Sequence, residues 1–297
     1  MRHRISLALF LAVLLTLLPG CRAIPATPEA AAEAARAFME ARVGGDAAAV
    51  ESMLTARARK EITRSQISLY LNEASTGYGG LGSPSPMEPG VVRIPVRDLT
   101  LTGRERSTRW PESWLTLRYE GDRWRVAWAE PLFNLAAQAY QNDRLVDELR
   151  YGHAIAAIDP YHYRGYLEQH FALRDLKRYR LAEVAINNAL ERAMPAQRPD
   201  VHDAMARFML QVNAPAQALT HARQALDLAA PHTPDTYSTR WQADTLVVAA
   251  RAALGLGDRT TAEALASQAA ALDPQNAELA IFRHQLVATP PPPPGGR

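Results

Sequence analysis

The sequence predicts a small α+β domain followed by an all-α helical-repeat solenoid, and three observations lead to this prediction. Residues 29–130 begin with helical periodicity and continue with segments in which apolar and polar residues alternate, the pattern of an antiparallel sheet packed on one face. Residues 132–288 show helical periodicity throughout, and a pattern of small residues returns in them several times. A length of 297 residues suits two domains of ordinary size.

The composition is that of a globular protein and argues against nucleic acid as a partner. Hydrophobic residues make up 47% of the chain and charged residues 22%, which is ample material for a core. Removal of residues 1–20 takes away Arg2 and Arg4, and leaves 31 basic side chains against 31 acidic ones. A neutral chain lacks the net basic footprint that binding to a nucleic acid duplex requires.

The N-terminus has the form of a secretory signal peptide, predicted over residues 1–20. Basic residues at positions 2–4 precede an almost continuous apolar stretch, Ile5–Leu18. This stretch is shorter than the ~20 apolar residues of a membrane-spanning helix. Cys21 is the only cysteine of the chain, so an intramolecular disulfide is excluded.

The segment Leu18-Pro19-Gly20-Cys21 resembles the lipobox of bacterial lipoproteins. The resemblance implies cleavage before Cys21, a diacylglycerol thioether on its sulfur and an acyl chain such as palmitate on the new N-terminus. Two lipid signals give stable anchoring to a membrane on the exported side. Arg22 stands where an aspartate favours the inner membrane, so the outer membrane facing the periplasm is expected in a Gram-negative cell. The alternative is an ordinary signal peptide with a chance cysteine.

Residues 29–130 are expected to form the α+β domain, joined to Cys21 by a short tether over residues 21–28. The order of its elements is three helices, a loop rich in glycine and proline, and a meander of three strands. The expected helices cover Pro28–Val43, Ala47–Leu54 and about Lys60–Ala74, the loop covers Thr76–Gly90, and the strands cover Val91–Leu101, Ser113–Tyr119 and Arg123–Trp128.

This order resembles that of nuclear transport factor two-like (cystatin-like) lipoprotein domains. The segment Phe38–Asp46, which includes the end of the first expected helix, looks like the first helical turn region of those domains. The resemblance implies helices packed on a curved antiparallel sheet around a cone-shaped pocket, and it carries no active site over. Gly77–Gly82 matches the Gly-x-Gly-x-x-Gly pattern of dinucleotide-binding turns. Such a turn follows a strand and opens a helix, whereas a helix precedes this one and prolines follow it, so a flexible loop is expected.

The small-residue pattern is clearest near the C-terminus. Ala262, Ala266 and Ala269 fall on one face of a helix that Pro274 ends, and glycines in Leu254–Asp258 provide the turn before it. Small side chains on one face allow two helices to approach closely. This arrangement resembles the tetratricopeptide repeat (TPR), a helix–turn–helix unit of 34 residues.

The same frame recurs with Ala182 and Ala189 and with Ala218 and Ala225. The longer interval before Ala262 points to an insertion, placed at Pro231–Gln242. Thr233-Pro234 is a suitable helix start, so the insertion is expected to lengthen the first helix of that unit. Four helix pairs are predicted over 132–158, 161–194, 199–230 and 233–273, with a capping helix over Ala277–Val287.

The first helices of stacked pairs line a concave face that typically binds a peptide or a helix of a partner. In the TPR frame one groove position falls on Phe171, Arg207 and Arg251 in successive units, so the two arginines are candidates for holding carboxylates of a partner. The alternative is a pair of solvated helix arginines. The complete set of partner-groove candidates is Arg164, Phe171, Arg174, Arg207, Gln211 and Arg251.

No pattern in the sequence indicates catalysis or a cofactor. The histidines form no His-Glu-x-x-His pair, Cys21 has no cysteine partner for zinc, and neither a Gly-x-Ser-x-Gly elbow nor a Walker loop occurs. His162 and His170 are expected at the surface or in the groove, and Tyr161 and Tyr163 are expected to be packing residues.

The predicted function is therefore a lipid-anchored scaffold, not an enzyme, that binds another envelope protein or peptide in its repeat groove. The alternative is small-molecule binding or catalysis in the pocket of the N-terminal domain. Residues 289–297 are expected to form a solvated tail, because the proline run Pro290–Pro294 adopts an extended helix that joins no core. The alternative for this tail is a ligand for a proline-binding groove.

Overall fold

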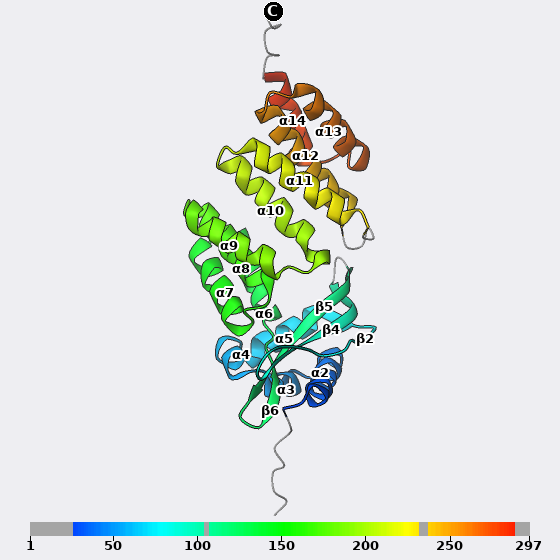
Figure 1. The fold of residues 1–297 in the computed structure, drawn as a ribbon, viewed down its shortest axis with the longest axis vertical. Helices are drawn as coiled ribbons and strands as arrows, with labels where there is room; N and C mark the ends of the chain where they lie inside the picture. The colour runs from blue at the N-terminus through cyan, green and yellow to red at the C-terminus, as the bar shows by residue number, and fades with distance from the viewer. Residues whose placement is uncertain (1–25, 104–106, 232–236, 289–297) are drawn as a thin grey trace, which may run out of the picture.

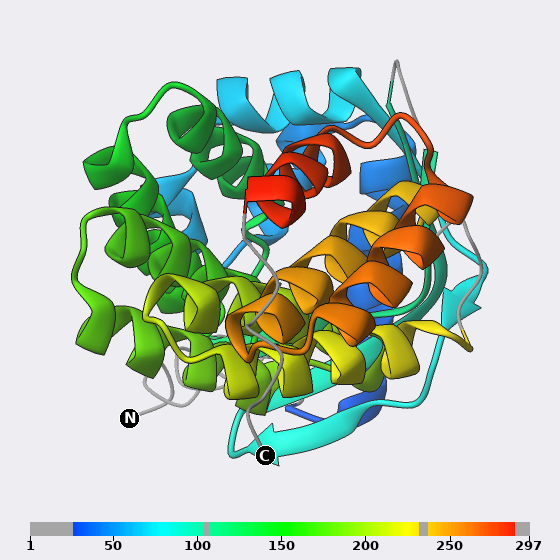
Figure 2. The ribbon, with the colours of Figure 1, turned by 90° about the horizontal axis from the view of Figure 1, so that it is seen from above.

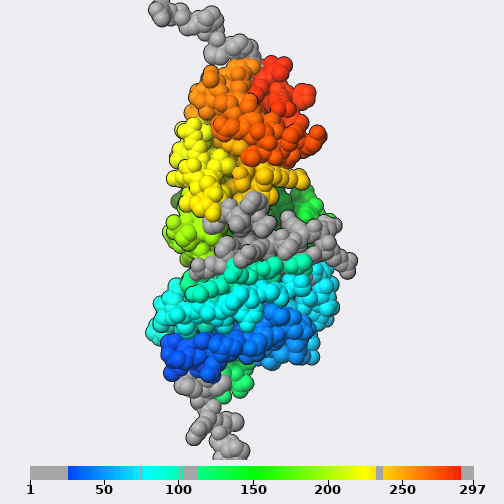
Figure 3. Space-filling view, turned by 90° about the vertical axis from the view of Figure 1, so that its right-hand side faces the viewer, coloured from blue at the N-terminus to red at the C-terminus, as the bar shows by residue number. Residues whose placement is uncertain are grey.

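The structure is a computed structural model that describes residues 26–103, 107–231 and 237–288. The expectations for the signal peptide, for Cys21 and for the proline run lie outside these residues. An α+β part and a stack of helical hairpins follow one another along the long axis of the molecule (Figure 1). The colours succeed one another along the same axis in the space-filling view (Figure 3), so segments that are near in sequence stay near in space, as in a repeat array.

Four helices open the N-terminal part: α2 (Pro28–Val43), α3 (Ala47–Met53), α4 (Ala56–Glu61) and α5 (Arg64–Glu73). Thr27 caps α2 through its hydroxyl, and Pro28 takes the first helical position, where its missing N–H costs nothing.

The single helix expected over Lys60–Ala74 is wrong, because the chain is extended at Ile62. The side chain of Ile62 enters the core, and Thr63 then caps α5, with its hydroxyl accepting a hydrogen bond from the Gln66 backbone N–H at 3.3 Å. The cap and the buried isoleucine together break the helix at this point.

The sheet has six strands, β1 (Ala74–Gly77), β2 (Gly80–Leu81), β3 (Ser85–Glu88), β4 (Val91–Gly103), β5 (Ser107–Glu120) and β6 (Arg123–Val126), and every pairing is antiparallel. Its order is β1-β4-β5-β6, with β2 and β3 also paired to β4. The three strands expected from alternation therefore form the body of the sheet, and β4 and β5 are longer than predicted.

The loop expected over Thr76–Gly90 is wrong, since β2, β3 and the end of β1 pair with the open edge of β4. The glycines in this segment make it look like a loop in the sequence, but they allow the short strands to pair with β4. A Cβ atom on Gly82 would lie 2.8 Å from the ring of Pro95, so only glycine permits this approach of the two strands.

The core of the N-terminal part lies between α2 and the sheet, where α2 packs against β1, β4, β5 and β6. Trp128 is buried there, and the rings of Phe38 and Tyr70 meet it edge-on with centroids 5.7 and 5.4 Å away. These rings pack together in the core between α2 and the sheet.

A buried ion pair fixes the helical part to this core. The guanidinium of Arg42, with a side chain only 1% exposed, donates to both carboxylate oxygens of Glu130, at 2.9 and 2.5 Å. The hydroxyl of Tyr70 also donates to Glu130. Burial alone would raise the pKa of Glu130, but Arg42 and Tyr70 hold it below its usual value. Glu130 begins the first helix of the solenoid, so the pair joins the two parts of the chain.

The helical part consists of antiparallel hairpins, and its helices are α6 (Glu130–Gln141), α7 (Leu145–Ile158), α8 (Tyr163–Asp175), α9 (Tyr179–Arg192), α10 (Arg198–Gln211), α11 (Pro215–Ala229), α12 (Thr239–Gly255), α13 (Arg259–Leu272) and α14 (Ala277–Ala288). A short 3-10 helix, η1 (Pro195–Gln197), precedes α10. The pairs α6/α7, α8/α9, α10/α11 and α12/α13 occupy the four predicted units. The hairpins turn progressively about the long axis, with α14 on the inner side of the curve (Figure 2).

One residue with positive φ marks the turn of each hairpin: Asp143, Lys177, Asn213 and Gly257. The next residue in each case donates its N–H to the carbonyl five positions earlier, at 2.8–3.0 Å, which ends the first helix in the same way four times. The turns thus define a common register for the repeats, although only the last one has the expected glycine.

The insertion before α12 differs from the prediction. The helix begins at Thr239 with Ser238 as its cap, so Thr233-Pro234 does not start it, and residues 232–236 lie outside the described part of the chain. α12 nevertheless has 17 residues, against 13 in α8 and 14 in α10.

None of the helices in the described residues is both long enough and apolar enough to cross a bilayer.

Candidate functional site

A groove with a volume of about 500 Å³ lies on the inner side of the hairpin stack. The described side chains that line it all come from the first helices of the four hairpins, α6, α8, α10 and α12, as expected for the concave face of such repeats. The lining side chains are Ala137, Tyr140 and Gln141 of α6, Tyr163, Arg164, Leu167, Glu168, Phe171 and Arg174 of α8, Asp200, Asp203, Ala204 and Arg207 of α10, and Trp241 of α12.

Four of the six residues singled out from the sequence line this groove: Arg164, Phe171, Arg174 and Arg207. Gln211 is exposed at the end of α10, where its amide donates to the Tyr179 hydroxyl at 3.5 Å. Arg251 is not among the lining side chains, because α14 packs against α12 at that level.

The arginines of the groove already bind carboxylates of this chain. The Nε atom of Arg164 donates to Glu168 at 3.0 Å, and Arg174 makes two hydrogen bonds to Asp175, at 2.6 and 2.8 Å. Two-point contacts of this kind are among the stronger side-chain interactions. Both guanidinium groups are therefore held in place and neutralised before any partner arrives.

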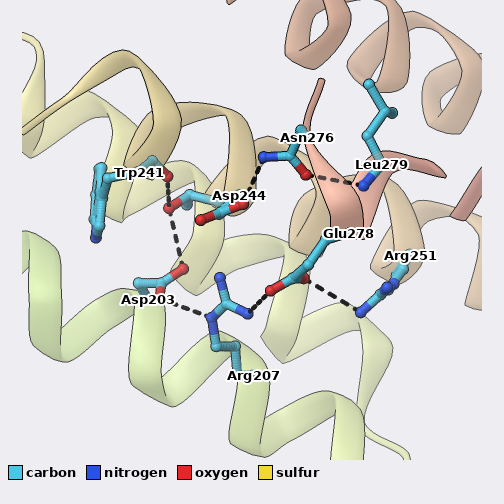
Figure 4. A network of polar contacts seen from close by, with 9 residues as sticks. Asp203, Arg207, Trp241, Asp244, Arg251, Asn276, Glu278 and Leu279 are labelled. Atoms are coloured by element: carbon cyan, nitrogen blue, oxygen red, sulfur yellow. Dashed lines mark hydrogen bonds and ion pairs between the residues drawn. The ribbon is translucent and has the colours of Figure 1, made fainter. Parts of the chain in front are cut away.

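Arg207 and Arg251 share a carboxylate that comes from α14. The two oxygens of Glu278 lie 2.8 Å from Arg207 Nη1 and 3.5 Å from Arg251 Nη1, and Arg207 also donates to Asp203 at 2.9 Å (Figure 4). The pair expected to hold carboxylates of a partner thus holds Glu278. The repeat pattern did not reveal this contact, because Glu278 lies 71 residues from Arg207 and outside the repeat frame.

Polar contacts fix α14 in this position. The Asn276 side chain caps α14 by accepting from the Leu279 backbone N–H at 2.9 Å, and it donates to Asp244 of α12 at 2.6 Å (Figure 4). The hydroxyl of Thr245 donates to Asp203 at 3.0 Å, which links α12 to α10. Several polar contacts, and not a single one, therefore hold α14 against α10 and α12.

Asp200 differs from the other acidic residues of the groove. Its carboxylate makes no hydrogen bond or ion pair with any described residue. Burial is the main cause that raises its pKa to about 7, while Arg164 acts to lower the pKa and Asp203 to raise it. Tyr163 and Trp241 line the same groove. Sequence reasoning missed Asp200, because it selected groove positions by their arginines and by Phe171.

Glu148 is a second acidic residue that sequence reasoning missed. It lies five residues after the turn of the first hairpin, where the later hairpins have Ala182, Ala218 and Ala262, and all four are fully buried. Both carboxylate oxygens lack a hydrogen-bond partner among the described residues. Burial, followed by the charge of Glu168, raises the pKa of Glu148 to about 8. An alignment on the alanines would have revealed this glutamate.

The histidines singled out from the sequence are structural. His170 is fully buried, which corrects the expectation of a surface or groove position; one ring nitrogen lies 2.9 Å from the Ala182 carbonyl oxygen and Phe208 meets the ring edge-on. His162 caps α8 and stacks on Tyr163, which is itself buried. No group of three or more potential metal ligands occurs in the described part of the chain.

A second cavity, of about 300 Å³, lies where the tether enters the N-terminal part. It is lined by Ala26 and Pro28, by the residues from Pro86 to Val92, and by Trp124. Glu88 is the one charged side chain among these lining residues. This cavity lies outside the filled core between α2 and the sheet, and it lacks convergent polar groups.

No family model matches this sequence, and no curated protein matches it. Solved structures that resemble the chain include MamA, with 13% identity over 50% of this chain and 81% of that one and a TM-score of 0.41. YrrB, described as a TPR protein with an unusual peptide-binding site, has 15% identity over 53% and 93%, with a TM-score of 0.31. PilW, described as a widely conserved type IV pilus biogenesis factor, has 21% identity over 54% and 67%, with a TM-score of 0.42. Because these TM-scores are below 0.5, the TPR-like architecture rests on the packing of α6–α14 and not on these likenesses.

Proposed function

We propose that this protein is an interaction scaffold whose groove receives an extended segment of a partner protein. The observation that carries the proposal is the groove itself, which crosses four successive inner helices and combines four aromatic side chains with charged ones. Packed helices lie about 8–10 Å apart, so the groove extends over roughly 27 Å, a length that about eight residues of extended chain would cover. Aromatic residues are enriched at the energetically important positions of protein interfaces.

The alternative function, a small-molecule site inside the N-terminal domain, has no comparable support. Phe38, Tyr70 and Trp128 pack together between α2 and the sheet. The charged groups of Arg42 and Glu130 bind each other there. This part of the chain instead acts as a base that holds the first hairpin of the solenoid through Glu130.

A photo-crosslinking amino acid placed in the groove would test the scaffold function in the native cell. Tyr140 suits this purpose because it lines the groove and is 47% exposed, so an aromatic photo-crosslinker replaces it without disturbing a core. Leu181 on α9 is 52% exposed and does not line the groove, which makes it the matched control. A discrete adduct from position 140 that is absent from position 181 is expected. Equal adducts from both positions, or none from position 140, would exclude the groove as a binding site.

We further propose that a lipid on Cys21 anchors the scaffold to the cell envelope, on the periplasmic face of the outer membrane in a Gram-negative cell. The support is the lipobox-like segment together with the shape of the molecule. The six residues between Cys21 and Pro28, the first residue of α2, allow a reach of at most about 25 Å, and α2 lies at the end of the molecule opposite α14 (Figure 1). An anchor there would place the α+β part next to the bilayer and the groove farther out.

Replacement of Cys21 by serine tests the anchor. The variant is expected to move from the membrane fraction to the soluble fraction, since a thioether-linked lipid requires the sulfur. Retention of the variant on membranes through a carbonate wash would rule out the lipid as the anchor.

A further inference from the structure

The charges of the groove indicate what kind of side chain it accepts. Arg164, Arg174 and Arg207 each have a carboxylate of the same chain within 3.0 Å. These carboxylates already neutralise the three arginines, so an acidic side chain of a partner would gain less from them than from an unpaired cation. The groove is therefore not organised for acidic residues, although arginines are its most conspicuous charged groups.

Asp200 differs from these arginines, because its carboxylate has no hydrogen-bond or ion-pair partner in the described part of the chain. It lies in the first turn of α10 and faces a groove lined by Tyr163 of α8 and Trp241 of α12. Trp241 lies on the same side of the polar network as Asp203, the neighbour of Asp200 on α10 (Figure 4). Tyrosine and tryptophan rings attract cations through their faces and pack against the aliphatic stems of lysine and arginine.

We propose that the groove recognises a lysine or arginine side chain of its partner segment, with the cationic group at Asp200 and the aliphatic stem against Trp241. This inference rests on the proposed function and adds the chemistry of the partner to it. The cation would pair with the groove carboxylate for which the described residues provide no partner. Charge complementarity of this kind determines specificity more than total affinity.

The affinity for a basic segment should depend on pH. The charged and titratable groups that face Asp200 are Tyr163 and Arg164 of α8, Asp203 of α10 and Tyr237 before α12. Burial places the pKa of Asp200 at about 7, and a bound cation favours the ionised carboxylate. Binding should therefore strengthen as pH rises from about 6 to about 8, and level off once the carboxylate is ionised.

Selection from a library of random peptides of about eight residues, displayed on phage, tests the inference with the full mature chain. Peptides that also bind the Phe171→Ala variant are discarded, so that the groove defines the remaining set. These peptides are expected to be enriched in lysine and arginine over aspartate and glutamate. Asp200→Asn is expected to weaken their binding by about tenfold or more and to remove its pH dependence.

Asp227→Asn, on an exposed residue of α11 outside the groove, is the matched control and should leave the binding unchanged. Circular dichroism and thermal melting establish that both variants fold like the wild type. Groove-dependent peptides that lack a basic preference, or that bind Asp200→Asn as well as the wild type, would overturn the inference and leave the scaffold function intact. Recovery of no groove-dependent peptide would overturn the scaffold function itself.

Discussion

Replacement of Glu148 by alanine should stabilise the protein at neutral and alkaline pH. The three later hairpins have alanine at this position, so the packing of two helices around an alanine is already compatible with the repeat frame. Glu148 is 0% exposed, and neither carboxylate oxygen has a hydrogen-bond partner among the described residues. A buried carboxyl group in this condition costs about 1–3 kcal/mol even when it is uncharged.

The pKa of Glu148 gives the size of the stability change and its dependence on pH. Burial raises it to about 8 in the folded protein, with Glu168 and Asp175 as further causes, whereas the unfolded chain has a value near 4.5. Because the folded state binds this proton more tightly, Glu148 makes the wild type lose stability as pH rises from about 4.5 to about 8. One pH unit between the two pKa values corresponds to about 1.4 kcal/mol, which sets an upper limit near 5 kcal/mol.

The gain for Glu148→Ala at about pH 8 should therefore be about 2–4 kcal/mol, after allowance for a residual cavity of smaller cost. At about pH 5 the gain should be about 1 kcal/mol or less. Urea unfolding, followed by circular dichroism of the helices at both pH values, measures the difference. Glu148→Gln keeps the volume and removes the charge, so it should lose the pH dependence but gain less. A variant no more stable than the wild type at about pH 8 would refute this account of the buried carboxylate.

Three other perturbations have defined outcomes. Glu130→Ala leaves the buried guanidinium of Arg42 unpaired and should lower the free energy of unfolding by about 3–5 kcal/mol in a tryptophan-fluorescence titration; a loss below about 1 kcal/mol would contradict the buried pair. Gly165→Ala would place a Cβ 2.6 Å from the Ala156 backbone nitrogen and should lower stability by about 1–3 kcal/mol, so an unchanged Tm would argue against this close crossing of α7 and α8. Burial lowers the pKa of His170 from 6.5 to about 4, so this residue should make the protein lose about 2 kcal/mol of stability as pH falls through that range. His170→Phe should reduce this loss, and an equal loss in the variant and the wild type would refute the role of the buried histidine.

The repeat register could be predicted from the sequence because its determinants are local. Ala182, Ala218 and Ala262 allow close helix packing, and each lies five residues after a turn with positive φ. Sequence reasoning found these alanines without knowing the turn geometry. It did not find the turns at Asp143 and Lys177, because a left-handed residue other than glycine or asparagine has no clear signal in a single sequence.

The sheet was predicted only where strands are long enough to alternate. The strands β4 and β5 have 13 and 14 residues, whereas β2 has two, and no periodicity can be recognised in two residues. The edge pairing depends instead on the space that Gly82 leaves for Pro95, which is a contact between distant residues. Glycine and proline usually mark a loop, although here they allow the edge strand β4 to be covered.

The electrostatics of the groove could not be predicted, because a residue outside the repeats determines them. Glu278 of α14 neutralises Arg207 and Arg251, whereas Asp200 has no hydrogen-bond or ion-pair partner among the described residues. Glu278→Gln should therefore change the preference of the groove, since Arg251 loses its carboxylate partner among the described residues while Arg207 keeps Asp203.

The Glu278→Gln variant would have one more net positive charge beside the groove. Its affinity for lysine-bearing peptides should fall by a few-fold, and its affinity for the same peptides with glutamate in place of lysine should rise by a similar factor. Fluorescence anisotropy with the two peptides measures both changes, and Glu263→Gln on the outer helix α13 serves as the control for a lost surface charge. If the two affinities did not move in opposite directions, α14 would be a cap for the apolar core of the last hairpin and would have no part in determining which partner the groove accepts.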